Sequence, residues 1–596
     1  MKIKKDYTKD TLFDELGLKR LKESYMKEDE VSPQDRFAFV SKSFASNEGH
    51  AQRLYGYASG HWLSYSTPIL SFGRNKRGLP ISCYLNYLDD TSEGLVNNLS
   101  ETNWLSMMGG GVGVHVGIRG CDEKSAGVMP HLKVYDSSSL AYKQGTTRRG
   151  SYAAYLDISH PDIIQFLEMR KPTGDQNMRT LNLNHGVNIP DKFMQIIEKC
   201  MVDPTFDDSW ELIQPHSGKV TEVVSAKALW MKLLELRMQT GEPYLWFIDR
   251  ANEGLPDYQK ALGLKNHGSN LCSEISLATS AERTAVCCLS SVNLEYYDEW
   301  KNDKLFLQDV LEMLDNVVEY FIQNAPDEIK RAKYSAQRER SVGVGALGFH
   351  AYLQKKNIAF EGPIAKSLNK QMFKHIRTEL DFANFKLATE RGACPDAAEF
   401  NIMKRCSHVM AVAPNASSSI IMGNTSPSIE PYSANAYRQD TSSGAFLNKN
   451  RFLDKIIKET AIGKDESWYD DTWASIIAND GSVQHLEWME DHTKDVFKTA
   501  PEIDQRWVIE HCSDRQQFVD QAISTNLFFR PDVNIKYLHA VHFQAWKQGL
   551  KSLYYVRSAK LRKADKVGQK VERKRIEDEI DMIALVNNET CIACEG

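Results

Sequence analysis

Hydrophobic residues recur at helical spacing in three parts of the chain, each just after a residue that commonly begins a helix. Ser32-Pro33 with Asp35 forms a capping-box-like start. Similar periods follow Ser225 and Asp309. The recurring apolar positions are Phe37, Val40 and Phe44, then Leu229, Trp230, Leu233 and Leu234, and then Val310, Leu314, Val317, Val318 and Phe321. The pattern predicts a helical N-terminal region over residues 1–66 and further helices later in the chain.

A different pattern starts at Thr67, where short apolar runs are separated by Gly, Pro and Asn. Such runs are typical of strands, and we expect strands at residues 68–70, 80–83, 112–117 and 181–189. Strands and helices interleave without a repeat of about 20 to 50 residues, which favours an α/β fold over a solenoid or propeller. Residues 556–596 are rich in charged side chains and are predicted to form a flexible tail.

The composition is that of an ordinary globular protein of 596 residues, with 42% hydrophobic and 26% charged residues. This balance excludes wholesale disorder. A net charge of −6, without a long block of one sign, does not favour a nucleic-acid polymer as partner. No apolar run reaches the length of a membrane span, and the charged start MKIKKDYTKD does not resemble a signal peptide. We therefore expect a cytoplasmic protein.

Two local patterns resemble ligand sites but lack the context that those sites require. Residues 343–348 match the Gly-x-Gly-x-x-Gly dinucleotide fingerprint, yet the polar run Gln337-Arg338-Glu339-Arg340 stands where an apolar strand should precede it. Close packing of a Gly-rich helix is the simpler interpretation. His485, Glu487 and His492 do not have the spacing that brings two imidazoles to one helix face. We assign no metal site.

Cysteines give the first chemical signal. The 11 cysteines are an odd number and too few for a secreted disulfide framework, so most are expected to be small buried apolar residues. In an extended segment, Asn270, Cys272 and Glu274 would project to the same side and present an amide, a thiol and a carboxylate to one space. A polar loop with a buried cysteine is the competing interpretation. Further thiols follow an apolar run at Cys287-Cys288 and stand upstream at Cys83.

Several such motifs occur together in this chain. They are Ser66-Thr67-Pro68, Ser82-Cys83, Asn270-Leu271-Cys272-Ser273-Glu274, Cys287-Cys288-Leu289-Ser290, Pro414-Asn415-Ala416-Ser417-Ser418, Leu553-Tyr554-Tyr555 and Cys591-Ile592-Ala593-Cys594. From about Ser66 to the C-terminus the chain resembles the catalytic large subunit of a class I ribonucleotide reductase. The stretch before Thr67 is too short for the ATP cone of larger members, so the resemblance is to a short form, for which we expect no cone-mediated dATP switch.

The resemblance implies a fold and a set of catalytic roles. The fold is a ten-stranded α/β barrel over residues 67–555, with a finger loop that carries Cys272 through its centre. Cys272 would form a transient thiyl radical that abstracts the 3′ hydrogen of a ribonucleotide. Glu274 would accept the 3′ hydroxyl proton, and Asn270 would orient the sugar. Cys83 and Cys287 would supply two reducing equivalents and end as a disulfide; Cys287 is chosen over Cys288 because it matches the family's Cys-x-Leu-Ser pattern.

The resemblance also implies roles for residues outside this group. Tyr554 and Tyr555, which alone would be ordinary sheet aromatics, would relay an electron and a proton from a radical on a separate small subunit. Cys591 and Cys594 would form an exposed dithiol that restores the reduced pair; half a zinc site is the competing interpretation. The residues expected around the substrate are Thr67, Ser82, Gly111, Pro414, Asn415, Ala416, Ser417 and Ser418. Asp90 and a loop from Lys171 to Arg179 are matched to a regulatory nucleotide site.

The implied activity is reduction of ribonucleoside diphosphates to deoxyribonucleoside diphosphates for DNA synthesis, by thiyl-radical chemistry. No cofactor is expected on this chain, since the radical cofactor lies on the small subunit, and nucleotide effectors are expected. The other implied partners are thioredoxin or glutaredoxin and a second copy of the chain in a homodimer. The alternatives are a cobalamin-dependent or glycyl-radical reductase, which the tyrosine pair and the C-terminal sequence disfavour, and a nucleotide-binding scaffold without chemistry.

Overall fold

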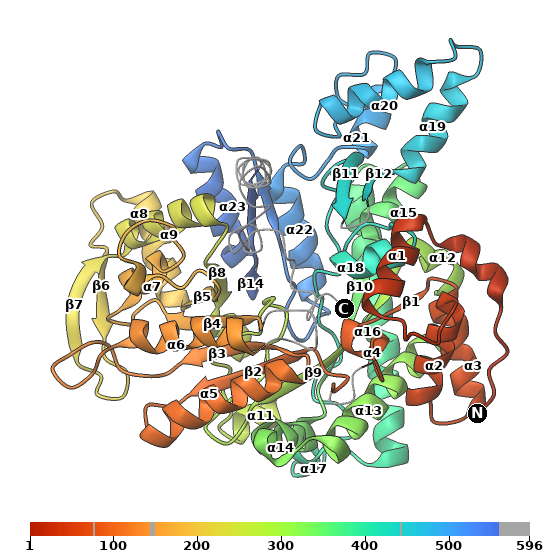
Figure 1. Cartoon of the computed structure of the whole chain (residues 1–596). Helices are drawn as coiled ribbons and strands as arrows, with labels where there is room; N and C mark the ends of the chain where they lie inside the picture. The colour runs from red at the N-terminus through yellow and green to blue at the C-terminus, as the bar shows by residue number, and fades with distance from the viewer. Residues whose placement is uncertain (75–77, 143–149, 442–443, 559–596) are drawn as a thin grey trace, which may run out of the picture.

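The N-terminal region is a group of helices packed beside the barrel. The computed structural model describes residues 1–74, 78–142, 150–441 and 444–558, and the N-terminal helices lie along one side of it (Figure 1). They are η1 (Tyr7–Leu12), α1 (Glu15–Ser24), α2 (Pro33–Phe44) and α3 (Glu48–Ser59). The capping box predicted at Ser32 and Asp35 is present and begins α2. The helical character of this region is therefore confirmed.

Five parallel strands form the first half of the barrel. They are β2 (Cys83–Leu88), β3 (Gly111–Val116), β4 (Tyr152–Asp157), β5 (Asn184–Ile189) and β8 (Tyr244–Phe247), paired in that order. The covering helices are α5 (Ser92–Met107), α6 (Val128–Ala141), α7 (Ile163–Glu168), α8 (Asp191–Val202) and α9 (Ala226–Thr240). A hairpin of β6 (Ser209–Ile213) and β7 (Val220–Ser225) lies beside α8 and α9 (Figure 1).

The second half contains three strands and two extended segments. The strands are β9 (Ala285–Asn293), β10 (Val342–Leu347) and β14 (Ser552–Leu553). A parallel bridge joins β10 to the segment 409–413. A second parallel bridge joins the segment 409–413 to the segment 521–525. The 521–525 segment meets the end of β14, where Tyr554 N donates to Thr525 O at 2.9 Å. The helices of this half are α13 (Phe306–Asn324), α14 (Lys330–Glu339), α15 (Phe349–Lys355), α16 (Pro363–Arg391), α22 (Gln505–Gln516) and α23 (Ile535–Lys547).

Antiparallel pairing closes the two halves on each other. At one seam β2 pairs with β9, and at the other β8 pairs with β14. The eight strands β2, β3, β4, β5, β8, β9, β10 and β14 and the two segments make ten, so the ten-stranded α/β barrel is confirmed. A small buried cluster that includes Cys83, Cys272 and Cys287 fills its interior, separate from the larger core beneath the helices.

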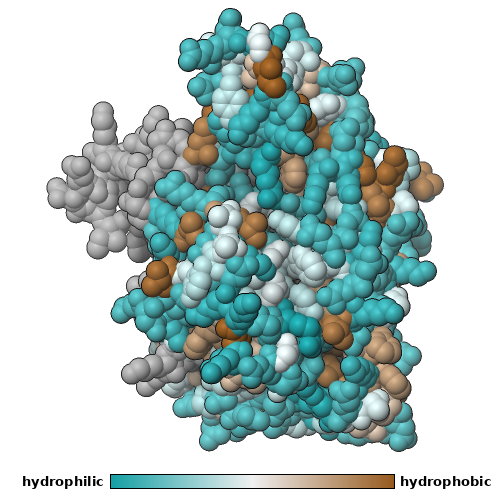
Figure 2. Space-filling view, turned by 90° about the vertical axis from the view of Figure 1, so that its right-hand side faces the viewer, coloured by the Kyte–Doolittle hydropathy of each residue, from teal (hydrophilic) through white to brown (hydrophobic). Residues whose placement is uncertain are grey.

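The remaining elements extend this frame. A short strand, β1 (Leu63–Tyr65), pairs with β9 beyond its contact with β2, and β13 (Leu527–Phe529) pairs with β15 (Val556–Ser558). A lobe with its own core extends from the barrel and contains β11 (Ala436–Thr441), β12 (Gly444–Lys449), α19 (Arg451–Ala461), α20 (Trp468–Ala478) and α21 (Asp491–Val496) (Figure 1). On the face that carries the N-terminal helices, hydrophilic residues predominate and apolar ones occur singly or in small groups (Figure 2). Within the described ranges, none of the helices has the length and hydropathy that a membrane span requires.

Three local predictions are wrong. The strand expected at residues 80–83 begins only at Cys83, the first residue of β2. Residues 68–70 form the end of a short helix, α4 (Thr67–Leu70), rather than a strand, because Pro68 stands at the start of a turn and favours helical geometry there. Residues 343–348 lie mainly in β10 and not in a helix. Close packing does explain these glycines: a Cβ at Gly343 would lie 2.4 Å from Leu289 Cδ2, and one at Gly345 would lie 2.8 Å from Ala411 O.

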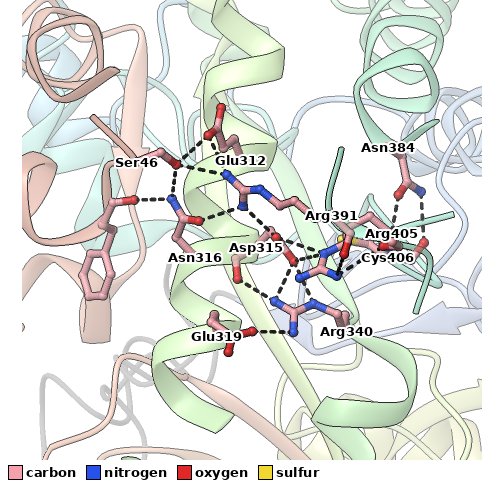
Figure 3. Close-up of polar contacts among 12 residues, drawn as sticks. Ser46, Glu312, Asp315, Asn316, Glu319, Arg340, Asn384, Arg391, Arg405 and Cys406 are labelled. Atoms are coloured by element: carbon pink, nitrogen blue, oxygen red, sulfur yellow. Dashed lines mark hydrogen bonds and ion pairs between the residues drawn. The ribbon is translucent and has the colours of Figure 1, made fainter. Parts of the chain in front are cut away.

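One buried carboxylate ties the helices of the second half together. Asp315, on α13, is fully buried and accepts hydrogen bonds from three arginines that come from separate parts of the chain (Figure 3). These are Arg340 at 2.8 Å, Arg391 at 2.9 Å and Arg405 at 3.0 Å. Glu312 and Glu319 pair with Arg391 and Arg340, so three acidic groups balance three cations. Burial alone would raise the pKa of Asp315, but the adjacent arginines lower it overall.

We predict that Asp315→Ala lowers stability strongly. Removing one partner of a buried ion network leaves uncompensated charge, which lowers the free energy of unfolding by about 3–5 kcal/mol. The pKa of Asp315 is lowered in the folded state, so the ionised carboxylate stabilises the fold at neutral pH. This stabilisation is lost as the pH falls below the pKa of an unfolded aspartate, about 3.9. Calorimetric melting at pH 7 measures the loss. Asp381→Ala, which breaks a half-exposed pair with Arg377, is the control and should change stability by less than about 1 kcal/mol. Equal effects of the two variants would contradict the prediction.

Candidate active site

The finger loop, residues 266–280, crosses the barrel interior and contacts both halves. It lies between α11 (Asp257–Ala261) and β9. Tyr155 on β4 donates its hydroxyl hydrogen to Asn270 O at 2.7 Å, and on the other side Ala522 N donates to Glu274 O at 2.9 Å. Because a buried loop backbone must find hydrogen-bond partners, these contacts from the barrel wall hold the loop in place.

A glycine on β3 makes this crossing possible. A Cβ at Gly113 would lie 1.9 Å from Ser269 O and 2.8 Å from Asn270 Cα. Real Cβ atoms do not approach a backbone so closely, so no larger residue fits here without displacing the loop. The Gly111-Val112-Gly113 run thus has one glycine at the point of closest approach and another, Gly111, beside Cys83 in the sheet register.

The expected extended geometry of residues 270–274 is wrong, although part of the expected grouping occurs. Ser273 has φ of 63°, so the backbone turns in the left-handed region instead of running straight. Asn270 Oδ1 caps this turn by accepting hydrogen bonds from the backbone N–H of Glu274 at 3.1 Å and of Ile275 at 3.3 Å. The side chains of Asn270 and Glu274 both reach Cys83, at 3.4 Å and 3.6 Å from its sulfur. Cys272 is fully buried in the same interior cluster.

Cys83 and Cys287 stand directly opposite each other on the antiparallel strands β2 and β9. Directly opposed residues have Cα atoms about 4.5–5.5 Å apart. This lies within the range of about 4.4–6.8 Å that a disulfide spans, so the pair can form a bridge without a large backbone movement. Both thiols are unbridged in this structure. Cys288 packs in the outer core instead, which supports the choice of Cys287.

Burial keeps the Cys287 thiol protonated. Loss of hydration raises its pKa well above the ordinary value, and the neighbouring Cys83 raises it further. A protonated thiol can donate a hydrogen atom, whereas nucleophilic exchange requires a thiolate. The environment therefore suits hydrogen and electron transfer to a substrate inside the barrel.

Tyr554 and Tyr555 lie in a cluster of three tyrosine rings. Their centroids are 4.3 Å apart, and Tyr244 on β8 lies 4.7 Å from the first and 5.0 Å from the second. Tyr554 and Tyr244 belong to the same interior cluster as Cys272. Burial raises the pKa of Tyr244 and of Tyr555, which keeps both phenols neutral. Tyr554 thus lies in the interior cluster that contains the thiols, and Tyr555 packs against that cluster.

The segment 414–418 follows the extended segment 409–413 and begins α18 (Ala416–Ile421). Asn415 adopts φ of 57° and hydrogen-bonds Ser291 and Ala346 O through its amide. Arg20 of α1 donates to Ser417 Oγ at 3.0 Å, and its Nε has no hydrogen-bond partner among the described residues. A cation therefore stands at the hydroxyl-rich turn.

The other expected residues lie at varied distances from this centre. Ser82 Oγ lies 3.2 Å from Cys83 Sγ, and Thr67 Oγ1 lies 3.2 Å from the Tyr25 hydroxyl. Asp90 follows β2 at its other end and accepts from Arg119 Nε at 2.7 Å. Lys171 to Arg179 form a loop on the same half of the barrel. Cys591 and Cys594 lie outside the described residues.

Several residues in contact with the site were not found from the sequence. They include Arg20, Tyr155, Tyr244, Gln521 and Ser524. Ser524 donates to Cys272 O and lies 3.2 Å from Glu274 Oε2, so it holds the finger loop at two points. None stands within a recognisable motif, because each reaches the site only through barrel closure or helix packing.

Comparisons with known proteins agree with this geometry. A ribonucleotide reductase barrel-domain family model matches residues 81–404 and 401–556, and the all-alpha domain model of the same enzymes matches residues 11–78. The ribonucleoside-diphosphate reductase large subunit of Invertebrate iridescent virus 3 is 49% identical, with 94% of this chain and 96% of that protein covered. The Danio rerio large subunit is 30% identical and is covered over 76% of its length. The Actinobacillus ureae class Id ribonucleotide reductase alpha subunit superposes with a TM-score of 0.81 at 33% identity, covering 93% of this chain and 98% of its own.

Fold and site together define a ten-stranded barrel protein in which an opposed thiol pair faces a buried finger loop. The chain belongs to the ribonucleotide reductase large-subunit family. The resemblance inferred from the joint motifs is thereby confirmed, while the roles of individual residues stay predictions.

We predict that Gly113→Ala displaces the finger loop. The added methyl overlaps Ser269 O, and overpacking of this kind costs about 1–3 kcal/mol or more. A lower melting temperature and faster alkylation of Cys272, measured by peptide mass spectrometry, are the expected results.

Gly56→Ala is the control for this change. A Cβ at Gly56, in α3, meets nothing within 4 Å, and alanine is the better helix former. This variant should keep or slightly raise the melting temperature. If Gly113→Ala also leaves melting and Cys272 labelling unchanged, the loop does not depend on that contact.

Proposed function

We propose that this chain reduces ribonucleoside diphosphates to deoxyribonucleoside diphosphates by thiyl-radical chemistry, together with a radical-generating small subunit. The observation that carries the proposal is the opposed pair Cys83 and Cys287 within reach of the finger loop that holds Glu274 and Cys272. A pair of buried thiols beside a carboxylate provides hydrogen atoms, electrons and a base in one enclosed space.

The proposed reaction restores Cys272 and Glu274 and consumes only the thiol pair. A thiyl radical on Cys272 takes the 3′ hydrogen, Glu274 takes the 3′ hydroxyl proton, and the 2′ hydroxyl leaves as water. Cys83 and Cys287 together provide two electrons and two protons and become a disulfide. The 3′ hydrogen then returns from Cys272, and Glu274 returns its proton to the 3′ oxygen. The net change exchanges the 2′ hydroxyl and two thiols for a 2′ hydrogen, a disulfide and water.

The tyrosine cluster supports the need for a partner subunit. Its rings are in contact and lie in the thiol cluster, so Tyr554 and Tyr555 can pass an electron toward Cys272. The partner's radical cofactor supplies the oxidising equivalent that starts each turnover. Thioredoxin or glutaredoxin, acting through Cys591 and Cys594, would restore the dithiol. A homodimer, regulation by nucleotides near Asp90 and a cytoplasmic location complete the proposal.

We expect deoxynucleotide formation from mixed ribonucleoside diphosphates when the full chain is combined with its cognate small subunit and a dithiol reductant. Cys272→Ser should lower the rate of deoxynucleotide formation by about 10³-fold or more, as expected for loss of an essential group. Cys288→Ala is the matched control, because that thiol lies in the outer core, and it should retain activity within about threefold. Product from Cys272→Ser, or from the chain without its partner, would contradict the proposal.

A second prediction concerns the substrate phosphates. Arg20 stands against Ser417 with an unused Nε–H, so we expect it to bind the diphosphate. Arg20→Ala should raise KM for the nucleotide about tenfold or more, the value of a charged hydrogen bond, with kcat little changed.

Lys22→Ala is the control for the Arg20 change. Lys22 is an exposed cation on the same helix, and its loss should leave KM within about twofold. Arg20→Lys should restore part of the affinity. A fall in kcat with unchanged KM would show that Arg20 does not bind substrate.

A further inference from the structure

Gln521 occupies a rigid position at the start of the 521–525 segment. It is fully buried, and its backbone N donates to Met410 O at 3.1 Å. Its carbonyl accepts from Lys551 Nζ at 2.8 Å and from Gln516 Nε2 at 2.9 Å. The direction of the side chain is therefore set by a clamped backbone.

The Gln521 amide joins the finger loop to one of the paired thiols. Its Oε1 accepts from the backbone N of Ser276 at 3.3 Å. Its Nε2 donates to Val342 O at 3.0 Å and lies 3.3 Å from Cys287 Sγ and 3.4 Å from Ser341 Oγ. An amide nitrogen carries two hydrogens, so one serves Val342 O and the other is shared between the thiol and the hydroxyl.

We propose that Gln521 is a positioning residue that stabilises the reduced form of Cys287. In the dithiol state the sulfur accepts a hydrogen bond from the amide. Disulfide formation removes two electrons and two protons from Cys83 and Cys287 and brings the sulfurs to about 2.05 Å, so Cys287 Sγ has to move toward Cys83. The movement weakens the contact with an amide that cannot follow, because its other atoms are bonded to Val342 and Ser276.

This arrangement has a consequence for turnover. The inference rests on the proposed function, in which each product molecule leaves a Cys83–Cys287 disulfide that an external dithiol must reduce. A hydrogen bond present only in the dithiol shifts the equilibrium between the Cys83–Cys287 disulfide and the two thiols toward the thiols. The next cycle requires this reduced pair. Gln521 acts through Cys287 and does not itself need to touch the nucleotide.

The test is a redox titration of the full chain against mixtures of reduced and oxidised dithiothreitol. Thiols are trapped by alkylation, and the Cys83–Cys287 disulfide is quantified by peptide mass spectrometry, which separates it from Cys591 and Cys594. In Gln521→Met, which is similar in size but cannot donate, the midpoint ratio should shift about fivefold toward the disulfide, the value of one hydrogen bond. Wild-type and variant melting temperatures are compared in the same samples.

Two further variants make the result specific. Gln505→Met removes a buried amide that bonds the backbone of Ala500, Ile503 and Phe528 and contacts neither Gln521 nor a sulfur, so its midpoint should stay within twofold of wild type. Gln521→Glu keeps an acceptor for Ser276 and, when ionised, has no hydrogen to donate, so it should shift the midpoint in the same direction as Gln521→Met. It also serves if Gln521→Met does not fold.

An unchanged midpoint in the Gln521 variants, or an equal shift in Gln505→Met, would overturn the inference. In steady-state assays at limiting dithiol, Gln521→Met should lower kcat and leave KM for the nucleotide within twofold; a matching rise in KM would also contradict it. If the wild-type chain makes no deoxynucleotide, the proposed function fails, yet the redox titration still decides whether Gln521 stabilises the dithiol.

Discussion

The passage of a polar loop through a closed barrel is the constraint on which the rest of the structure depends. Its backbone must find partners inside an apolar space, because an unsatisfied buried group costs about 1–3 kcal/mol. Tyr155, Ala522 and Ser524 supply these partners from opposite walls, and Gly113 supplies the room. The wall residues are therefore as much a part of the site as the loop. They fix where Glu274 and Cys272 stand relative to Cys83 and Cys287.

The same enclosure selects the chemical state of the thiols. Burial raises the pKa of Cys287, so the group in the barrel is a neutral hydrogen donor rather than a nucleophile. Such a thiol is a poor partner for exchange with an external protein, which needs an accessible thiolate. One environment cannot serve both purposes. In the proposed function a second dithiol, Cys591 and Cys594, carries out this exchange, which would give a physical reason for a thiol pair far in sequence from Cys83 and Cys287.

Sequence reasoning succeeded where a residue type has one strong local or motif-level meaning. The capping box at Ser32, the helix after Ser225 and the joint motifs that identified the family are of this kind. It failed where distant packing decides. The apolar run at Pro68 forms a helix, and the glycines from 343 to 348 pack a strand against Leu289 and Ala411. Residues 521–525 have no strand alternation, yet they complete the barrel and hold the finger loop. Their contacts with Val412, Ser276 and Glu274 join them to residues more than a hundred positions away in sequence. Nothing local marks Ser524 or Tyr244 as site residues.

A buried carboxylate connects the tyrosine cluster to the loop matched to nucleotide regulation. Glu242 stands two residues before Tyr244 and accepts from His185 Nδ1 at 3.0 Å and from the His185 backbone at 3.1 Å. Its other oxygen pairs with Arg170 at 3.5 Å, and Arg170 also donates to Leu181 O across the base of the loop from Lys171 to Arg179. Burial would raise the pKa of Glu242, but Arg170 and His185 lower it, so the charge is retained. Because a buried ion cannot lose its partner cheaply, the Glu242–Arg170 pair holds the base of this loop against the segment that leads into β8.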